Sequence, residues 1–210
     1  MQFDFIKDLD EYFCEKYANY DKICVLPGYR MPTMQETKVD DFGRKYSYTL
    51  PAETMCLAKQ EKCAELLAEL KSRLSDKNFS FTFRPLGFFQ RIYEAFSKKS
   101  FPNRLKGVCR RHNADPNLLA EGLEIDPAIW KRILKGELYP SKPLLFAMGL
   151  SAHFTYQETE LLLGASGYLF DFEDVTDTVV SYLLLKEIYN QAMVQAALEE
   201  YKVLPLPIKW

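Results

Sequence analysis

Basic side chains gather in the middle of this sequence, between residues 101 and 142. This stretch holds 8 basic and 5 acidic residues, whereas residues 143–210 hold 3 basic and 9 acidic ones. Lys and Arg bind the phosphates of nucleic acids whatever the base sequence, so the pattern predicts a face that contacts an anion or an acidic partner. The basic side chains concerned are Arg104, Lys106, Arg110, Arg111, Lys131, Arg132, Lys135 and Lys142.

Residues that commonly carry catalysis or bind metals are scarce. Cys109 precedes His112 by one helical turn, but no second pair of ligands completes a zinc-binding spacing. The motifs of serine hydrolases, zinc proteases and P-loop nucleotide-binding proteins are missing from the sequence. Glu158 and Glu160 are expected on an exposed helix face, without the apolar setting that raises a carboxyl pKa. We therefore expect no enzyme, no metal site and no cofactor.

Composition indicates a folded, water-soluble chain of 210 residues with a net charge of -2 and 48% hydrophobic residues. Such a chain is too apolar and too weakly charged to be disordered. The longest apolar stretch, residues 143–154, is shorter than a membrane-spanning helix requires, and no secretory leader is evident. The 5 cysteines form no C-x-x-C pair and are predicted to be free thiols in the cytoplasm.

The first half of the chain mixes helix and strand patterns. Helical spacing of apolar residues predicts helices over residues 3–19 and from Pro51 to Leu74. Short strands are predicted at residues 23–26, 46–49 and 79–84, and residues 28–44 are expected to form a loop. A further helix is expected from Phe88 to Phe96. We therefore predict a small α/β module over residues 1–97, with a boundary at residues 97–100.

Strand patterns stop after residue 100. Asp115-Pro116 and Asp126-Pro127 each place a capping carboxylate before a proline, which is typical of a helix start. Closely spaced short helices predict an all-α domain over residues 101–210, and the fold class is α+β overall. The predicted helices are residues 101–112, 115–122, 126–135, 141–152, 155–165, 174–188 and 190–201.

Residues 104–158 resemble the helix-turn-helix domain of phage-repressor-like regulators, the XRE or Cro/C1 family, in an extended form that continues to about residue 200. The resemblance implies a five-helix domain in which residues 126–135 form the recognition helix. The matching segments are residues 104–112, residues 118–120, the turn at residues 123–125, residues 126–135, the element Lys135-Gly136-Glu137-Leu138-Tyr139-Pro140-Ser141, the fourth-helix residues Leu144, Leu145, Ala147, Met148 and Leu150, and residues 155–158.

The resemblance implies a transcriptional regulator that holds duplex DNA. The start of the recognition helix, Asp126-Pro127-Ala128, offers an acid and no side-chain donor to the bases, so binding is expected mainly through phosphates. The alternative is a protein-interaction adaptor that keeps the fold without binding DNA. The predicted DNA-binding residues are Arg104, Lys106, Arg110, Arg111, Asn117, Trp130, Lys131, Arg132, Lys135 and Lys142.

The last third of the chain is apolar almost all round its predicted helices. Residues 174–210 must therefore be buried, either within the chain's own core or against a second subunit or other protein partner. The end of the chain, residues 203–210, contains Pro205, Pro207 and Trp210 and is expected to pack back on the protein.

Overall fold

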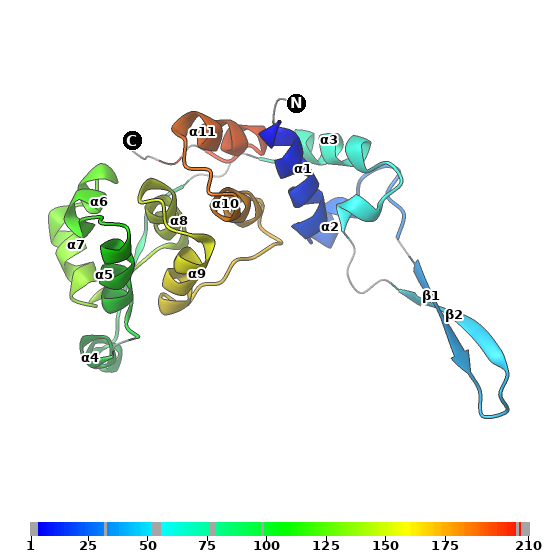
Figure 1. Ribbon diagram of the computed structural model, residues 1–210, viewed down its shortest axis with the longest axis horizontal. Helices are drawn as coiled ribbons and strands as arrows, with labels where there is room; N and C mark the ends of the chain where they lie inside the picture. Colours follow the sequence, from blue (N-terminus) through cyan, green and yellow to red (C-terminus); the bar gives the residue numbers. More distant parts are fainter. Residues whose placement is uncertain are drawn as a thin grey trace. The chain divides into compact units, whose positions relative to one another are not determined.

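A computed structural model describes residues 4–31, 33–51, 56–75, 79–97, 99–204 and 206. Helices and two small antiparallel sheets make up the chain, so its fold is α+β, as predicted (Figure 1). Contacts divide it into two compact units, which we call unit 1 (residues 1–74 and 172–178) and unit 2 (residues 75–171 and 179–210). This division falls after Leu74, whereas the sequence predicted a boundary at residues 97–100.

Unit 1 packs short helices around the apolar face of its first helix. Leu9 and Phe13 of that helix are buried, as are Leu66 and Leu70. Lys71 Nζ donates to Asp10 Oδ1 at 2.7 Å and so links the first and last of these helices. Residues 172–178 join this unit, and the Phe172 carbonyl accepts from the amide of Ala18. Its helices are α1 (Phe5–Lys16), α2 (Tyr20–Ile23), the short 3-10 helix η1 (Leu57–Lys59) and α3 (Cys63–Arg73).

The predicted strand at residues 23–26 is wrong. Ile23 ends α2, and Ile23 and Leu26 are buried while Val25 is 64% exposed. Burial of two residues three positions apart is helical spacing, so the apolar run belongs to a helical turn. The predicted helix from Pro51 to Leu74 is also shorter in the structure, which describes η1 and then α3 within this range.

A two-stranded antiparallel ribbon also belongs to unit 1, and it corrects the predicted loop at residues 28–44. β1 (Thr33–Val39) pairs with β2 (Lys45–Pro51), which includes the predicted strand at residues 46–49 (Figure 1). Gly43 takes a φ of +77° in the connecting turn, and Asp40 accepts from the amides of Phe42 and Arg44. Sequence patterning missed β1 because its side chains do not alternate between apolar and polar.

Unit 2 begins with a strand that pairs far along the chain. β3 (Phe83–Pro85) pairs with β4 (Leu138–Pro140), so residues 83–96 pack with the helices that follow them. Because this pairing joins residues on both sides of the predicted boundary at residues 97–100, both sides belong to the same compact unit. No strand was predicted at β4, and residues 79–82 of the predicted strand lie outside β3. The helices of this unit are α4 (Phe88–Phe96), α5 (Phe101–Arg111), α6 (Pro116–Gly122), α7 (Pro127–Leu134), α8 (Lys142–Ser151), α9 (Tyr156–Ala165) and α11 (Gln191–Glu200), and α10 (Val175–Leu185) contributes its residues from Val179 onward.

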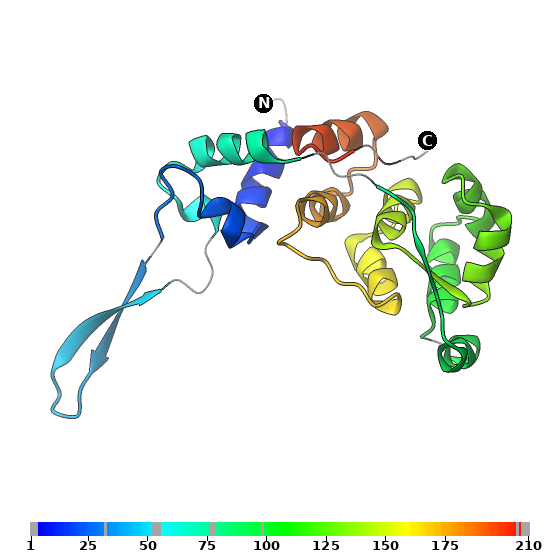
Figure 2. The ribbon, with the colours of Figure 1, turned by 180° about the vertical axis from the view of Figure 1, so that it is seen from behind.

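Helix α8 forms the centre of unit 2 and packs against α9 (Figure 2). Every residue from Leu144 to Leu150 is buried. Gly149 allows a close approach, because a Cβ there would lie 2.7 Å from Thr159 Oγ1 on α9. Residues of α10 from Val175 to Leu184 are buried within the chain as well, which is the first of the two burial arrangements that the sequence left open.

The end of the chain packs on the protein as far as the structure describes it. Val203 and Leu206 are buried, and the amide of Val203 donates to the carbonyl of Leu198 at 2.7 Å. Residues 205 and 207–210 of the predicted docking segment lie outside the described residues. None of the helices in the described ranges has the length and apolar character needed to cross a membrane.

Gly136, in the turn between α7 and β4, should tolerate no larger side chain. Its φ is +70°, and a Cβ would lie 2.8 Å from Glu94 Cβ. Gly136→Ala combines a left-handed backbone with a steric clash, so we expect the free energy of unfolding to fall by about 2–4 kcal/mol. Denaturant unfolding measures this, with Gly107→Ala as the control. Gly107 lies within α5 with nothing near its Cβ position, and its replacement should raise stability by about 0.5–1 kcal/mol.

Candidate functional site

The helices from α5 to α9, which we call the head, contain the residues predicted to bind a ligand. Both α6 and α7 begin with a proline that follows a capping aspartate. Asp115 accepts from the amide of Asn117, and Asp126 accepts from the amides of Ala128 and Ile129. Between the two helices Glu124 takes a φ of +54°, and the Ile125 amide donates to the Ala120 carbonyl. These local bonds fix the turn between α6 and α7.

Helix α7 turns one face inward and one face outward. Trp130 and Ile133 are buried, whereas Ala128, Lys131 and Lys135 are exposed. Trp130 is only 4% exposed, so its indole is part of the packing between helices and is not a side chain free to reach a ligand. The outward face is therefore short and carries two lysines one turn apart.

Three of the predicted phosphate-binding arginines bond to other groups of the protein. Arg111 Nε lies 2.8 Å from Glu158 Oε1, and Arg132 Nε lies 3.3 Å from Glu137 Oε2. Arg104 donates to the carbonyl of Leu161 at 3.1 Å. Lys142 is half-buried, with its ammonium 6.0 Å from the centre of the Phe146 ring. The remaining predicted residues, all exposed, are Lys106, Arg110, Asn117, Lys131 and Lys135.

A groove with a cavity volume of about 690 Å³ lies between α6 and α7. The sequence did not predict it, because its lining comes from both helices and from the turn between them. Carboxylates outnumber cations along it, with Glu121, Glu124 and Asp126 against Lys131 alone. Its remaining lining residues are Asn117, Ala120, Ile125, Pro127, Trp130 and Leu134.

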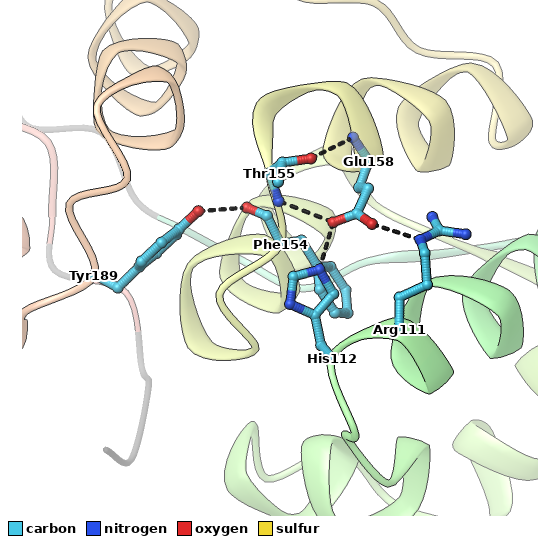
Figure 3. Close-up of polar contacts among 6 residues, drawn as sticks. All are labelled: Arg111, His112, Phe154, Thr155, Glu158 and Tyr189. Atoms are coloured by element: carbon cyan, nitrogen blue, oxygen red, sulfur yellow. Dashed lines mark hydrogen bonds and ion pairs between the residues drawn. The ribbon is translucent and has the colours of Figure 1, made fainter.

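Glu158 ties the end of α5 to the start of α9 (Figure 3). Its carboxylate accepts from Arg111 Nε at 2.8 Å and from the Thr155 amide at 3.0 Å, and one oxygen lies 2.5 Å from His112 Nε2. The Glu158 amide in turn donates to Thr155 Oγ1, which completes a capping box. Nearby, the Tyr189 hydroxyl donates to the carbonyl of Phe154.

The environment of Glu158 corrects the expectation that it lies on an exposed face. Its side chain is 14% exposed. Burial alone raises the pKa of this carboxyl, but hydrogen bonds from Arg111, the Thr155 amide and His112 outweigh burial and lower the pKa from 4.5 to about 2. The pattern Thr155-x-x-Glu158 is a capping-box signature, so the sequence did contain a signal for this role.

No family model, curated protein or solved structure matches this chain. The likeness of residues 104–158 to Cro/C1-type domains therefore stays a prediction from sequence. Among the described residues, no three His, Cys, Asp or Glu side chains gather in a way that could hold a metal ion.

Glu158 should stabilise the head in a pH-dependent manner. Because its pKa is lower in the folded state, its contribution is complete above pH 4.5 and is lost as the pH falls through about 2. At neutral pH we expect Glu158→Gln to lower the free energy of unfolding by about 1–3 kcal/mol, an amount limited by the exposure of Arg111. Thermal or urea unfolding at a series of pH values measures the difference between variant and parent.

The matched control is Glu160→Gln, an exposed carboxylate on the same helix. It should leave stability nearly unchanged at every pH. A constant difference between Glu158→Gln and the parent from neutral pH down to about pH 2 would contradict the role assigned to this ion pair.

Proposed function

We propose that this chain is a protein-interaction adaptor whose α6–α7 groove binds a peptide segment with apolar and basic side chains. We also propose that α5–α9 share the arrangement of the Cro/C1-type head, which the order and spacing of these helices support. The observation that carries the function is the set of carboxylates that line the groove, Glu121, Glu124 and Asp126, which we call the acidic rim; Asp126 caps the start of α7. This is the end of the helix with which repressors of this family commonly meet DNA.

The apolar part of the groove supplies the contact area. Ala120, Ile125, Trp130 and Leu134 contribute to its lining, and its volume is within the range of sites that hold a few side chains. Trp130 is held in the packing between the helices, so the small part of its ring that lines the groove loses little conformational entropy when a partner binds. An aliphatic side chain of the partner would be the anchor here.

Charge selects the class of partner. Glu121, Glu124 and Asp126 place carboxylates along the groove, and Lys131 is the cation that accompanies them. Phosphates of duplex DNA would be repelled by this excess of negative charge, whereas Lys or Arg side chains of a peptide would be attracted. The capping bonds of Asp126 to α7 amides hold its carboxylate in place at the groove.

A peptide titration tests this function. The probe is a short synthetic peptide of alternating leucine and lysine, compared with a leucine–glutamate peptide and a serine–lysine peptide of equal length. Trp130 reports binding through its fluorescence once Trp210, the other tryptophan of the sequence, is replaced by Phe. We expect saturable binding of the leucine–lysine peptide and at least about tenfold weaker binding of the other two, because each lacks one of the two recognised features.

Charge reversal at the rim provides the second test. Glu121→Lys/Glu124→Lys should weaken binding of the leucine–lysine peptide by about tenfold or more. The control is Glu160→Lys on α9, outside the groove, which makes the same change of charge at one residue. It should have little effect on peptide affinity. Equal affinity of parent and double variant, or equal binding of the lysine and glutamate peptides, would show that the groove does not select basic partners.

Duplex DNA is the second candidate ligand, and one observation favours it. Lys131 of α7 lies one turn before Lys135, the exposed residue that caps the end of α7, and Lys106 and Arg110 have the same spacing on α5. Four cations on two helices could hold phosphates without reading bases.

A gel-shift titration at about 50 mM salt separates the two candidates. DNA binding that weakens with added salt, disappears in Lys131→Glu/Lys135→Glu and strengthens in Glu121→Lys/Glu124→Lys would replace the adaptor proposal. We expect no shift of the parent protein at this salt concentration.

A further inference from the structure

The ribbon formed by β1 and β2 is exposed on both faces over residues 35–39 and 45–49. Every residue from Gln35 to Val39 is exposed, and among residues 45–49 of β2 only Tyr48 is half-buried. A two-stranded ribbon alone is marginally stable in water, and its outer edges are ready to pair with another strand. The ribbon is therefore an element whose backbone can still form a larger sheet.

The turn determines which backbone groups point outward. The Asp40 amide donates to the Arg44 carbonyl at 2.9 Å, so Asp40 and Arg44 are a hydrogen-bonded pair. Hydrogen-bonded and non-hydrogen-bonded pairs alternate along an antiparallel ladder. With the observed register, Lys38–Tyr46 and Glu36–Tyr48 are hydrogen-bonded pairs as well. The amides and carbonyls that point away from the ribbon on the β1 side are then those of Gln35, Thr37 and Val39.

We propose that β1 pairs antiparallel with β1 of a second copy of this chain, centred on Thr37, to form a four-stranded sheet. In this register Thr37 faces Thr37 of the second copy, and Gln35 faces Val39 of the second copy. These are the residues with outward backbone groups, so each pair exchanges two hydrogen bonds across the new interface. The arrangement is two-fold symmetric and closes on itself, as expected of a homodimer.

Charge complementarity selects this partner. The same register places Glu36 opposite Lys38 of the second copy, and Lys38 opposite its Glu36. Both are non-hydrogen-bonded positions, where facing side chains come closest and opposite charges stabilise a sheet. Within one chain these groups are only at the limit of an ion pair, with Lys38 Nζ 4.0 Å from Glu36 Oε2. Tyr48 orients both, because its hydroxyl donates to Glu36 and its ring lies 4.8 Å from Lys38 Nζ.

Pairing through the β2 edge, or binding of nucleic acid by the ribbon, agrees less well with the sequence of the ribbon. β2 ends at Pro51, which has no amide to donate, and its self-pairing about Ser47 would place no opposite charges together. Over residues 33–51 the ribbon has 3 basic and 3 acidic residues, so it lacks the positive excess that nucleic acid requires. The inference concerns unit 1 and is independent of the function proposed for the α6–α7 groove.

Proline substitutions on the two edges test the pairing. Thr37→Pro removes an outward amide of β1 without breaking a bond of the ribbon itself, and Ser47→Pro does the same on β2. Light scattering coupled to gel filtration, over a wide range of protein concentration, measures the mass. We expect a dimer for the parent and for Ser47→Pro, and a monomer for Thr37→Pro. Circular dichroism and thermal unfolding verify that all three are folded. A monomeric parent, or equal masses for the two proline variants, would overturn the proposal.

Charge exchange tests the register independently of proline. Glu36→Lys places like charges opposite each other in the homodimer, and so does Lys38→Glu, so each variant alone should be monomeric. When the two variants are mixed in equal amounts, Glu36→Lys supplies positive side chains at positions 36 and 38, and Lys38→Glu supplies negative ones. The mixture should therefore form heterodimers. Glu36→Lys/Lys38→Glu should also dimerise alone. Dimers of either single variant as stable as the parent dimer would rule out this register.

Discussion

The carboxylate of Glu158 is the point at which the two ends of the head are held together. Arg111 and His112 finish α5, Thr155 begins α9, and their polar groups converge on a side chain that is largely withdrawn from water. A buried carboxylate is costly unless it accepts several hydrogen bonds, and Glu158 accepts enough of them to stay charged. The position of α6 and α7, and therefore of the groove between them, depends on α5 being anchored in this way.

Much of the helical part could be predicted from sequence because its signals are local. Asp115-Pro116 and Asp126-Pro127 start α6 and α7 where expected, and the capping bonds that explain this involve residues only two or three positions apart. The pairing of β3 with β4 could not be predicted in the same way. Each strand has three residues, and their partners are more than fifty positions away in the chain.

The ribbon was missed for another physical reason. Alternation of apolar and polar residues marks a strand only when one of its faces is buried, and β1 has both faces in water from Gln35 to Val39. The run of apolar residues at Ile23 to Leu26 shows the opposite error, since four consecutive apolar residues fit a helical turn as well as a strand. Burial of Ile23 and Leu26, which are three positions apart, indicates the helical turn and not the strand.

The candidate site could be located by sequence but not characterised. Basic residues are visible in any sequence, but their availability depends on partners such as the Leu161 carbonyl, 57 positions from Arg104. The acidic groove is lined by two consecutive helices and the turn between them, all within residues 117–134, and its shape depends on how α6 packs against α7. Binding of DNA stays a prediction, and its residues are now divided into those bonded internally and those exposed.

Helix α8 has a consequence for the dynamics of unit 2. A helix that is buried from Leu144 to Leu150 has no side from which water can reach its amides. Its amide protons can exchange with deuterium only when the unit as a whole opens, so their exchange rates report the global stability of the fold. The outward amides of Gln35, Thr37 and Val39 in a single chain have no such protection and would exchange within the shortest labelling times.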